Sequence, residues 1–319
     1  AFNQFLNLTN IAEQAESTEG ADDLSQLETL FMRLTDLGVD NDSIIETINE
    51  LHCDLVLTAH PTEITRRTLI QKYNRIASAL EHVNEDMELD AEIRINLERL
   101  IAEVWYTDEI RTERPKPQDE AIWGYAVIEH SLWHAIPDLW DRLEYLLFKY
   151  TGAKLSLDVA PVKISSWMGG DRDGNPNVTA RVTGEVLRLA RWMAADLYLR
   201  DIEELLSQLS MSACSSTLSE LCPESHDEPY RYILRKLRKE LTDTRAWAET
   251  SEPPRSGLIL TTTDLISPLT ICYDSLHECG MGIIADGLLK KTLVRANTFG
   301  VTLLELDVRQ SSNRHIELL

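Results

Sequence analysis

Long hydrophobic runs are missing from this sequence, and so is a cysteine framework. No stretch approaches the roughly 20 consecutive apolar residues that a transmembrane helix needs. The five cysteines, at positions 53, 214, 222, 272 and 279, show no C-x-x-C spacing typical of a zinc site. No charged and apolar leader opens the chain. We therefore predict a cytoplasmic protein with reduced thiols and no membrane partner.

Positive charge is also scarce, because 31 lysines and arginines face 53 acidic residues and the net charge is −22. Such a surface would repel a phosphate backbone, so we expect no nucleic-acid partner. The sequence also lacks the glycine-rich phosphate-binding motifs of nucleotide-binding folds. A small anionic substrate would need several arginines gathered in one pocket, because the net negative charge of the protein repels anions elsewhere.

Apolar residues recur at the helical period through most of the chain. The pattern predicts a break or kink at Pro137, and helix ends at Gly280 and Gly300. It predicts helices over 64–83, 90–112, 118–150, a long segment after Thr179, 228–249, 263–279 and 282–298.

Three short segments depart from the helical period and are predicted strands: 55–59, 162–167 and 304–309. Each leads into polar residues, as catalytic groups follow the strands of a parallel barrel. Three strands cannot close an eight-stranded barrel, and the long intervals require inserted helices. We therefore predict a predominantly α-helical fold with a few short parallel strands, an incomplete portion of a (β/α)8 TIM-type barrel with large helical insertions.

Both ends of the chain carry amphipathic helical patterns that stop abruptly. The sequence begins inside one such pattern at Ala1 and ends inside another at Leu319. We expect residues 1–319 to form a single unit that is part of a longer protein.

His60 follows the first predicted strand and precedes Pro61. An imidazole accepts and returns protons near neutral pH, and the proline favours extended backbone at the histidine. The alternative is a buried histidine that is satisfied by a backbone carbonyl. Arg66 and Arg67 follow at the start of the next predicted helix, where they bind an anion, contact a subunit, or form surface ion pairs.

The segment SSWMGGDRDGNPNVTA, from Ser165 to Ala180, follows the second strand. Its Asp-x-Asp-x-Asn pattern is not a calcium loop, because the sixth position is Pro176 and the twelfth is Val182. Two interpretations stay open for Asp171, Arg172 and Asp173: a charged network that braces a tight loop, or direct contact with a substrate.

Arg309 ends the third predicted strand and shares a face with Glu305 and Asp307. That face lines a polar cavity, or else the strand is an exposed edge. A guanidinium at a strand end suits bidentate binding of a phosphate or carboxylate.

Three segments together resemble the phosphoenolpyruvate carboxylases of bacterial type, in the N-terminal to middle portion of that family. They are LVLTAHPTEITRR at 55–67, SSWMGGDRDGNPNVTA at 165–180 and FGVTLLELDVRQSSNRH at 299–315. The resemblance implies carboxylation of phosphoenolpyruvate by bicarbonate to oxaloacetate and phosphate, through carboxyphosphate and the enolate of pyruvate. His60 matches the family's essential histidine, the expected base, and Arg309 matches a phosphate-binding arginine.

The resemblance also implies what this chain lacks. The family uses Mg²⁺ or Mn²⁺, and its metal-binding carboxylates and a mobile loop lie beyond the equivalent of Leu319. We therefore expect no metal ligands in this chain and no activity from the chain alone, with the complete enzyme an allosteric homotetramer. We assign substrate binding to Arg309 and Arg172, and loop-bracing or anion and subunit contacts to the remaining residues of these motifs: Asp171, Asp173, Arg66 and Arg67.

Two other functions stay open at this point. The chain is a non-catalytic helical module for interaction or assembly, or it belongs to another phosphotransfer enzyme that uses phosphoenolpyruvate. The latter would carry a phosphorylated histidine.

Overall fold

The computed structural model describes residues 7–11, 23–58, 67–80, 91–107, 116–172, 175–223 and 227–312. This part of the chain divides into two compact units. The first contains the described residues up to Gly38 together with 67–107, and the second contains 39–58 and 116–312. The single unit expected over 1–319 stays a prediction.

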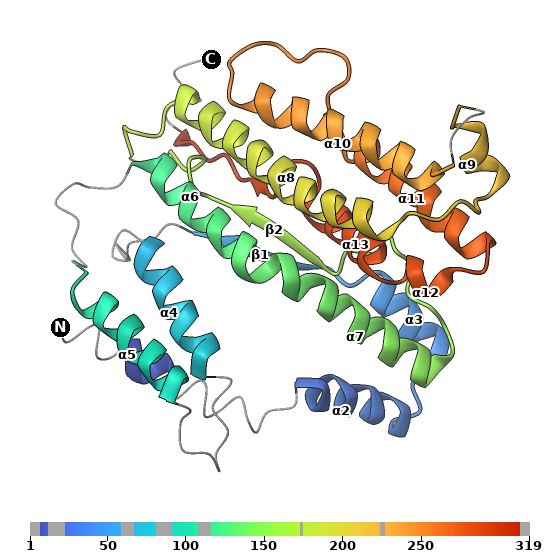
Figure 1. Cartoon of the computed structure of the whole chain (residues 1–319). Helices are drawn as coiled ribbons and strands as arrows, with labels where there is room; N and C mark the ends of the chain where they lie inside the picture. The colour runs from blue at the N-terminus through green and yellow to red at the C-terminus, as the bar shows by residue number, and fades with distance from the viewer. Residues whose placement is uncertain are drawn as a thin grey trace. The chain divides into compact units, whose positions relative to one another are not determined.

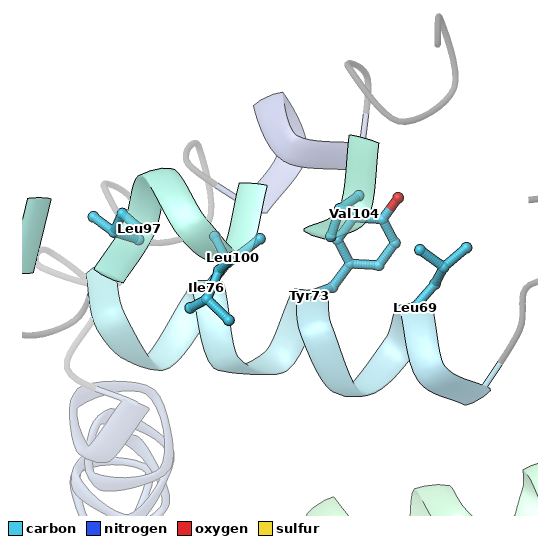
Figure 2. Packing of buried hydrophobic residues seen from close by; sticks show 6 residues of the cluster. All are labelled: Leu69, Tyr73, Ile76, Leu97, Leu100 and Val104. Atoms are coloured by element: carbon cyan, nitrogen blue, oxygen red, sulfur yellow. The ribbon is translucent and has the colours of Figure 1, made fainter. Parts of the chain in front are cut away.

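The first unit contains α2 (Asp23–Asp36), α4 (Arg67–Leu80) and α5 (Ala91–Trp105). The predicted helices at 64–83 and 90–112 are therefore confirmed over most of their length. Apolar residues three and four positions apart share one face of each helix. These faces meet in a buried cluster, with Leu69, Tyr73 and Ile76 from α4 and Leu97, Leu100 and Val104 from α5 (Figure 2).

The second unit is built on a small parallel sheet with the order β1-β2-β3. Its strands are β1 (Cys53–Leu57), β2 (Val162–Ser166) and β3 (Glu305–Leu306). β2 is central and alternates buried and half-buried residues, whereas β1 is exposed along most of its length. The prediction of a few short parallel strands is confirmed, although β1 begins and ends two residues before the predicted 55–59. Three strands do not form a closed barrel, so the predicted TIM-type barrel stays a proposal.

Helices surround this sheet in the second unit (Figure 1). α8 and α10 run antiparallel, because Arg238 pairs with Glu203 while Arg245 pairs with Asp196. The helices are α3 (Asn41–Asn49), α6 (Pro117–Val127), the π-helix η1 (Ile128–Leu132), α7 (Trp133–Thr151), α8 (Ala180–Gln208), α9 (Ser216–Glu220), α10 (Pro229–Ala248), α11 (Thr262–Glu278), α12 (Gly282–Ala285) and α13 (Leu288–Phe299). No helix in the described ranges is long and apolar enough to cross a membrane.

The helix predicted over 118–150 does not break at Pro137, which lies inside α7. Proline has no N–H, so the carbonyl of Trp133, four residues earlier, lacks its helical donor. Arg295 of α13 replaces that donor, with its Nε 2.7 Å from the Trp133 carbonyl oxygen. The π-helix η1 precedes α7, and there the Trp133 N–H reaches back to the carbonyl of Ile128. A tertiary contact therefore carries the helix through the proline.

Candidate functional site

The carboxyl ends of the three strands meet at one edge of the sheet. Leu57 of β1 pairs with Ser166 of β2, and Ser166 pairs with Leu306 of β3. The pairing continues one residue further, since Trp167 N–H donates to the Leu57 carbonyl at 3.0 Å and Asp307 N–H donates to the Ser166 carbonyl at 2.9 Å. The segments that follow β2 and β3 therefore leave the sheet side by side.

The chain after β2 turns tightly over residues 167–172. Gly170 and Asp171 both donate their N–H groups to the Trp167 carbonyl, at 3.0 and 2.9 Å. Gly169 has a φ of 78°, which favours glycine. A Cβ on Gly170 would lie 2.3 Å from the carbonyl oxygen of Asp307. The two glycines thus allow this turn to approach the end of β3 closely.

The backbone of the turn fixes the backbone of Arg309. Asp171 and Arg309 form a parallel β-bridge. Arg309 N–H donates to the Gly170 carbonyl and Arg172 N–H donates to the Arg309 carbonyl, each at 3.1 Å. The structure therefore brings together two of the predicted motifs, which lie far apart in the sequence.

Among the described residues, the guanidinium of Arg309 contacts the side chains of Trp167 and Asp307. Its guanidinium carbon lies 3.9 Å from the centroid of the Trp167 ring, a cation–π distance. Oδ2 of Asp307 accepts from Nε at 3.0 Å and lies 2.9 Å from Nη2. The Arg309 side chain is 49% exposed. A cation at this strand end is thus held in place and still open to a ligand.

The side chain of Arg172 lies in a different environment from that of Arg309. Its Nη2 lies 3.4 Å from the hydroxyl of Thr183, which itself donates to the Gly169 carbonyl at 2.8 Å. These contacts fit the loop-bracing interpretation. Its Nε is buried and has no hydrogen-bond partner among the residues that the structure describes. A buried N–H without an acceptor is costly, so this atom keeps the substrate-contact interpretation open.

The charged face of the third strand is paired at an exposed edge. Lys163 of β2 and Glu305 of β3 form a cross-strand ion pair at 2.6 Å. The hydrogen bond to Glu305 raises the pKa of the Lys163 ammonium group. Asp307 pairs with Arg309 on the same face. This face was predicted to line a polar cavity or to be an exposed edge. Glu305 lies at an exposed edge, whereas Arg309 lies against the 167–172 turn.

Several predicted site residues lie outside the described residues: His60, Arg66 and Asp173. Arg67 begins α4, and only its backbone is described. Their roles stay predictions. Sequence reasoning named Asp307 only as a member of a charged face and gave Trp167 no role. The i, i+2 spacing of Asp307 and Arg309 was the available signal for their contact.

A metal centre was not expected in this chain. In the described ranges, no three His, Cys, Asp or Glu side chains lie close enough to hold a metal ion.

Comparison with known proteins gives one consistent result. The family model of phosphoenolpyruvate carboxylase matches residues 1–319. The chain belongs to the phosphoenolpyruvate carboxylase family. It is 51% identical to the phosphoenolpyruvate carboxylase of Hahella chejuensis and 52% identical to that of Pseudomonas entomophila. Each alignment covers 100% of this chain and 38% of the relative, so the chain spans well under half the length of these carboxylases.

Proposed function

We propose that this chain supplies part of the active site of a phosphoenolpyruvate carboxylase, which converts phosphoenolpyruvate and bicarbonate to oxaloacetate and phosphate. The observation that carries the proposal is the position of Arg309, held at the end of a parallel strand against the 167–172 turn in a chain that matches this family throughout. The catalysed reaction is proposed for the longer polypeptide to which we assign this chain.

Arg309 is the proposed ligand of the phosphoryl group. During phosphoryl transfer, negative charge spreads over the equatorial oxygens, and catalysis consists chiefly of holding and neutralising that charge. A planar guanidinium offers paired N–H donors to two of those oxygens. The buried Nε of Arg172 is available as a further donor if the turn shifts when ligand binds.

His60 is the proposed base. Transfer of the phosphoryl group to bicarbonate leaves carboxyphosphate and the enolate of pyruvate. His60 accepts the carboxyl proton of carboxyphosphate, which then separates into CO₂ and phosphate, and the enolate carbon attacks CO₂ to form oxaloacetate. In the sequence His60 stands three positions after Leu57, the last residue of β1, whose carbonyl bonds to Trp167. This spacing supports a location at the same edge of the sheet.

We further propose that the sheet is part of an eight-stranded barrel. Both described edges carry exposed apolar residues, with Leu55 at 40% and Val56 at 44% exposed on β1, and Val308 at 54% just after β3. Open edges with apolar side chains are suited to pairing with further strands. We also propose what the family implies for the longer polypeptide: Mg²⁺ or Mn²⁺ as the metal, allosteric control, a cytoplasmic location and a homotetramer. For Arg66, Arg67, Asp171 and Asp173 we propose loop-bracing, or contacts with an anion or a subunit.

The test is the substitution His60→Asn in the longer polypeptide. Asparagine keeps a polar side chain of similar size but cannot accept a proton at neutral pH. We expect phosphoenolpyruvate to bind with a dissociation constant within about threefold of wild type, while oxaloacetate formation falls by about 10²- to 10⁴-fold, the usual range for loss of a general base. Oxaloacetate production near the wild-type rate would overturn the role of His60.

A further inference from the structure

Two side chains restrict the guanidinium of Arg309 from different sides. Asp307 contacts Nε and Nη2 through a single oxygen, and the Trp167 ring lies against the guanidinium carbon. Both neighbours are attached to the sheet, since Asp307 and Trp167 each donate a backbone hydrogen bond to the preceding strand. The orientation of a half-exposed arginine is thus set by the framework of the site.

The Asp307 contact also decides which end of the guanidinium is open. Asp307 engages the Nε and Nη2 side, and Nη1 makes no hydrogen bond or ion pair with any residue in the described ranges. The Nη1 amino group and the second Nη2 hydrogen form the remaining two-pronged edge of the guanidinium. That edge has the geometry that binds two oxygens of a phosphoryl group.

We propose that Asp307 is a positioning residue that orients Arg309 toward the phosphoryl group of the substrate. This inference rests on the proposed function, in which Arg309 binds that group. Asp307 does not touch the substrate. It holds the guanidinium by the side that the substrate does not use, so that binding does not have to order a long flexible side chain.

A carboxylate near a phosphoryl group also has an unfavourable effect, because two anions repel each other. Here the carboxylate lies on the Nε side, with the guanidinium between it and the open edge. Arg309 and Asp307 are both partly exposed, so the repulsion is screened by solvent. Orientation therefore outweighs repulsion, and loss of the carboxylate weakens binding.

The experiment uses the longer carboxylase polypeptide that we propose contains this chain, with the variants Asp307→Asn, Asp307→Glu and Arg309→Lys. Glu305→Gln is the matched control, because Glu305 lies on the same strand face and pairs with Lys163 instead of Arg309. The readouts are kcat, the KM for phosphoenolpyruvate, and the competitive inhibition constant of inorganic phosphate, which probes the phosphoryl site alone.

For Asp307→Asn we expect the KM and the phosphate inhibition constant to rise together by about tenfold, because the amide oxygen can still accept from Arg309 but the hydrogen bond loses its charge. The kcat should stay within about twofold. Asp307→Glu should recover part of the affinity, and Glu305→Gln should match wild type in all three quantities.

The outcomes separate the two proposals. If Arg309→Lys leaves both constants unchanged, Arg309 does not bind the phosphoryl group and the proposed function of this site fails. If Arg309→Lys weakens both constants but Asp307→Asn does not, only the positioning role of Asp307 is overturned. A fall in kcat and melting temperature with no change in the phosphate constant would also overturn it, because that pattern belongs to a purely structural residue.

Discussion

Arg295 is a buried charged residue of the second unit that stabilises two other buried polar groups. Arg295 donates to the carbonyl of Trp133 and pairs with Asp201 at 2.8 Å, and its side chain is only 6% exposed. Burial raises the pKa of the Asp201 carboxyl group, while the charge of Arg295 opposes that rise. Arg295 therefore serves two partners at once, a carboxylate and the carbonyl that Pro137 leaves without a donor.

We predict that Arg295→Met lowers the free energy of unfolding by about 3–5 kcal/mol, because it leaves a buried carboxylate unpaired. Urea unfolding followed by circular dichroism measures this change. The control is Lys291→Met on the same helix, which removes a more exposed ion pair with Asp138 and should cost less than about 1 kcal/mol. The double variant Arg295→Met with Asp201→Leu should recover part of the loss. A cost for Arg295→Met no larger than that of the control would contradict the assignment.

At the scale of single elements, local signals explain where helices begin. α11 starts with a capping box, in which the Thr261 hydroxyl accepts from Asp264 N–H at 3.3 Å and Asp264 Oδ2 accepts from Thr261 N–H at 2.8 Å. The hydrogen bond from the Thr261 backbone lowers the pKa of the Asp264 carboxyl group. The Asp264 carboxylate therefore adds to the free energy of unfolding at pH values above the pKa that it has in the unfolded chain. This stabilisation is lost as the pH falls through the lower pKa of the folded protein.

We predict that Asp264→Ala costs about 1 kcal/mol of stability at pH 7, the usual value of a lost cap interaction. The difference from wild type should shrink as the pH falls below about 4, because protonation removes the charge from the wild-type side chain as well. Chemical unfolding at a series of pH values tests both statements. Asp274→Ala, an exposed position further along α11, should change stability by less than about 0.5 kcal/mol. A difference that does not depend on pH would contradict the role of the charge.

At the scale of the whole molecule, the chain matches carboxylases along its full length and spans 38% of theirs. Among the residues that the structure describes, its sheet has two open edges and no cluster of metal ligands. The strand ends bring together Trp167, Asp307 and Arg309, and we propose that Arg309 binds a phosphoryl group. The complete reaction is proposed for the longer polypeptide.

We therefore expect no oxaloacetate from these 319 residues alone. The purified chain is supplied with phosphoenolpyruvate, bicarbonate and Mg²⁺, and oxaloacetate is coupled to NADH oxidation by malate dehydrogenase. The complete carboxylase of a relative serves as the positive control. A rate above the background without protein, abolished by Arg309→Lys, would show that this part of the family is active by itself.

The sequence predicted much of the local structure. The helical period anticipated α4, α5, α8, α10 and α11, because long amphipathic patterns are robust signals. It missed α2, α3 and α9. The last two are short, and few apolar residues mark their faces. It predicted a break or kink at Pro137, and the helix does not break there, since the donor that replaces the missing N–H comes from a residue far away in the sequence.

By itself, the sequence determined the helical character of this protein, its three strands, its family and the residue types available for chemistry, because propensity, periodicity and motif letters are local properties. Only the tertiary structure decided that Arg309 lies over Trp167 with Asp307 on its Nε side. Trp167 and Arg309 are separated by more than a hundred positions, and the 167–172 turn reaches the end of β3 because Gly170 permits a close approach. Asp307 and Arg309 are only two positions apart, but their spacing does not fix which side of the guanidinium the carboxylate contacts. Such contacts arise from packing, and no local pattern encodes which side of a guanidinium is left for a ligand.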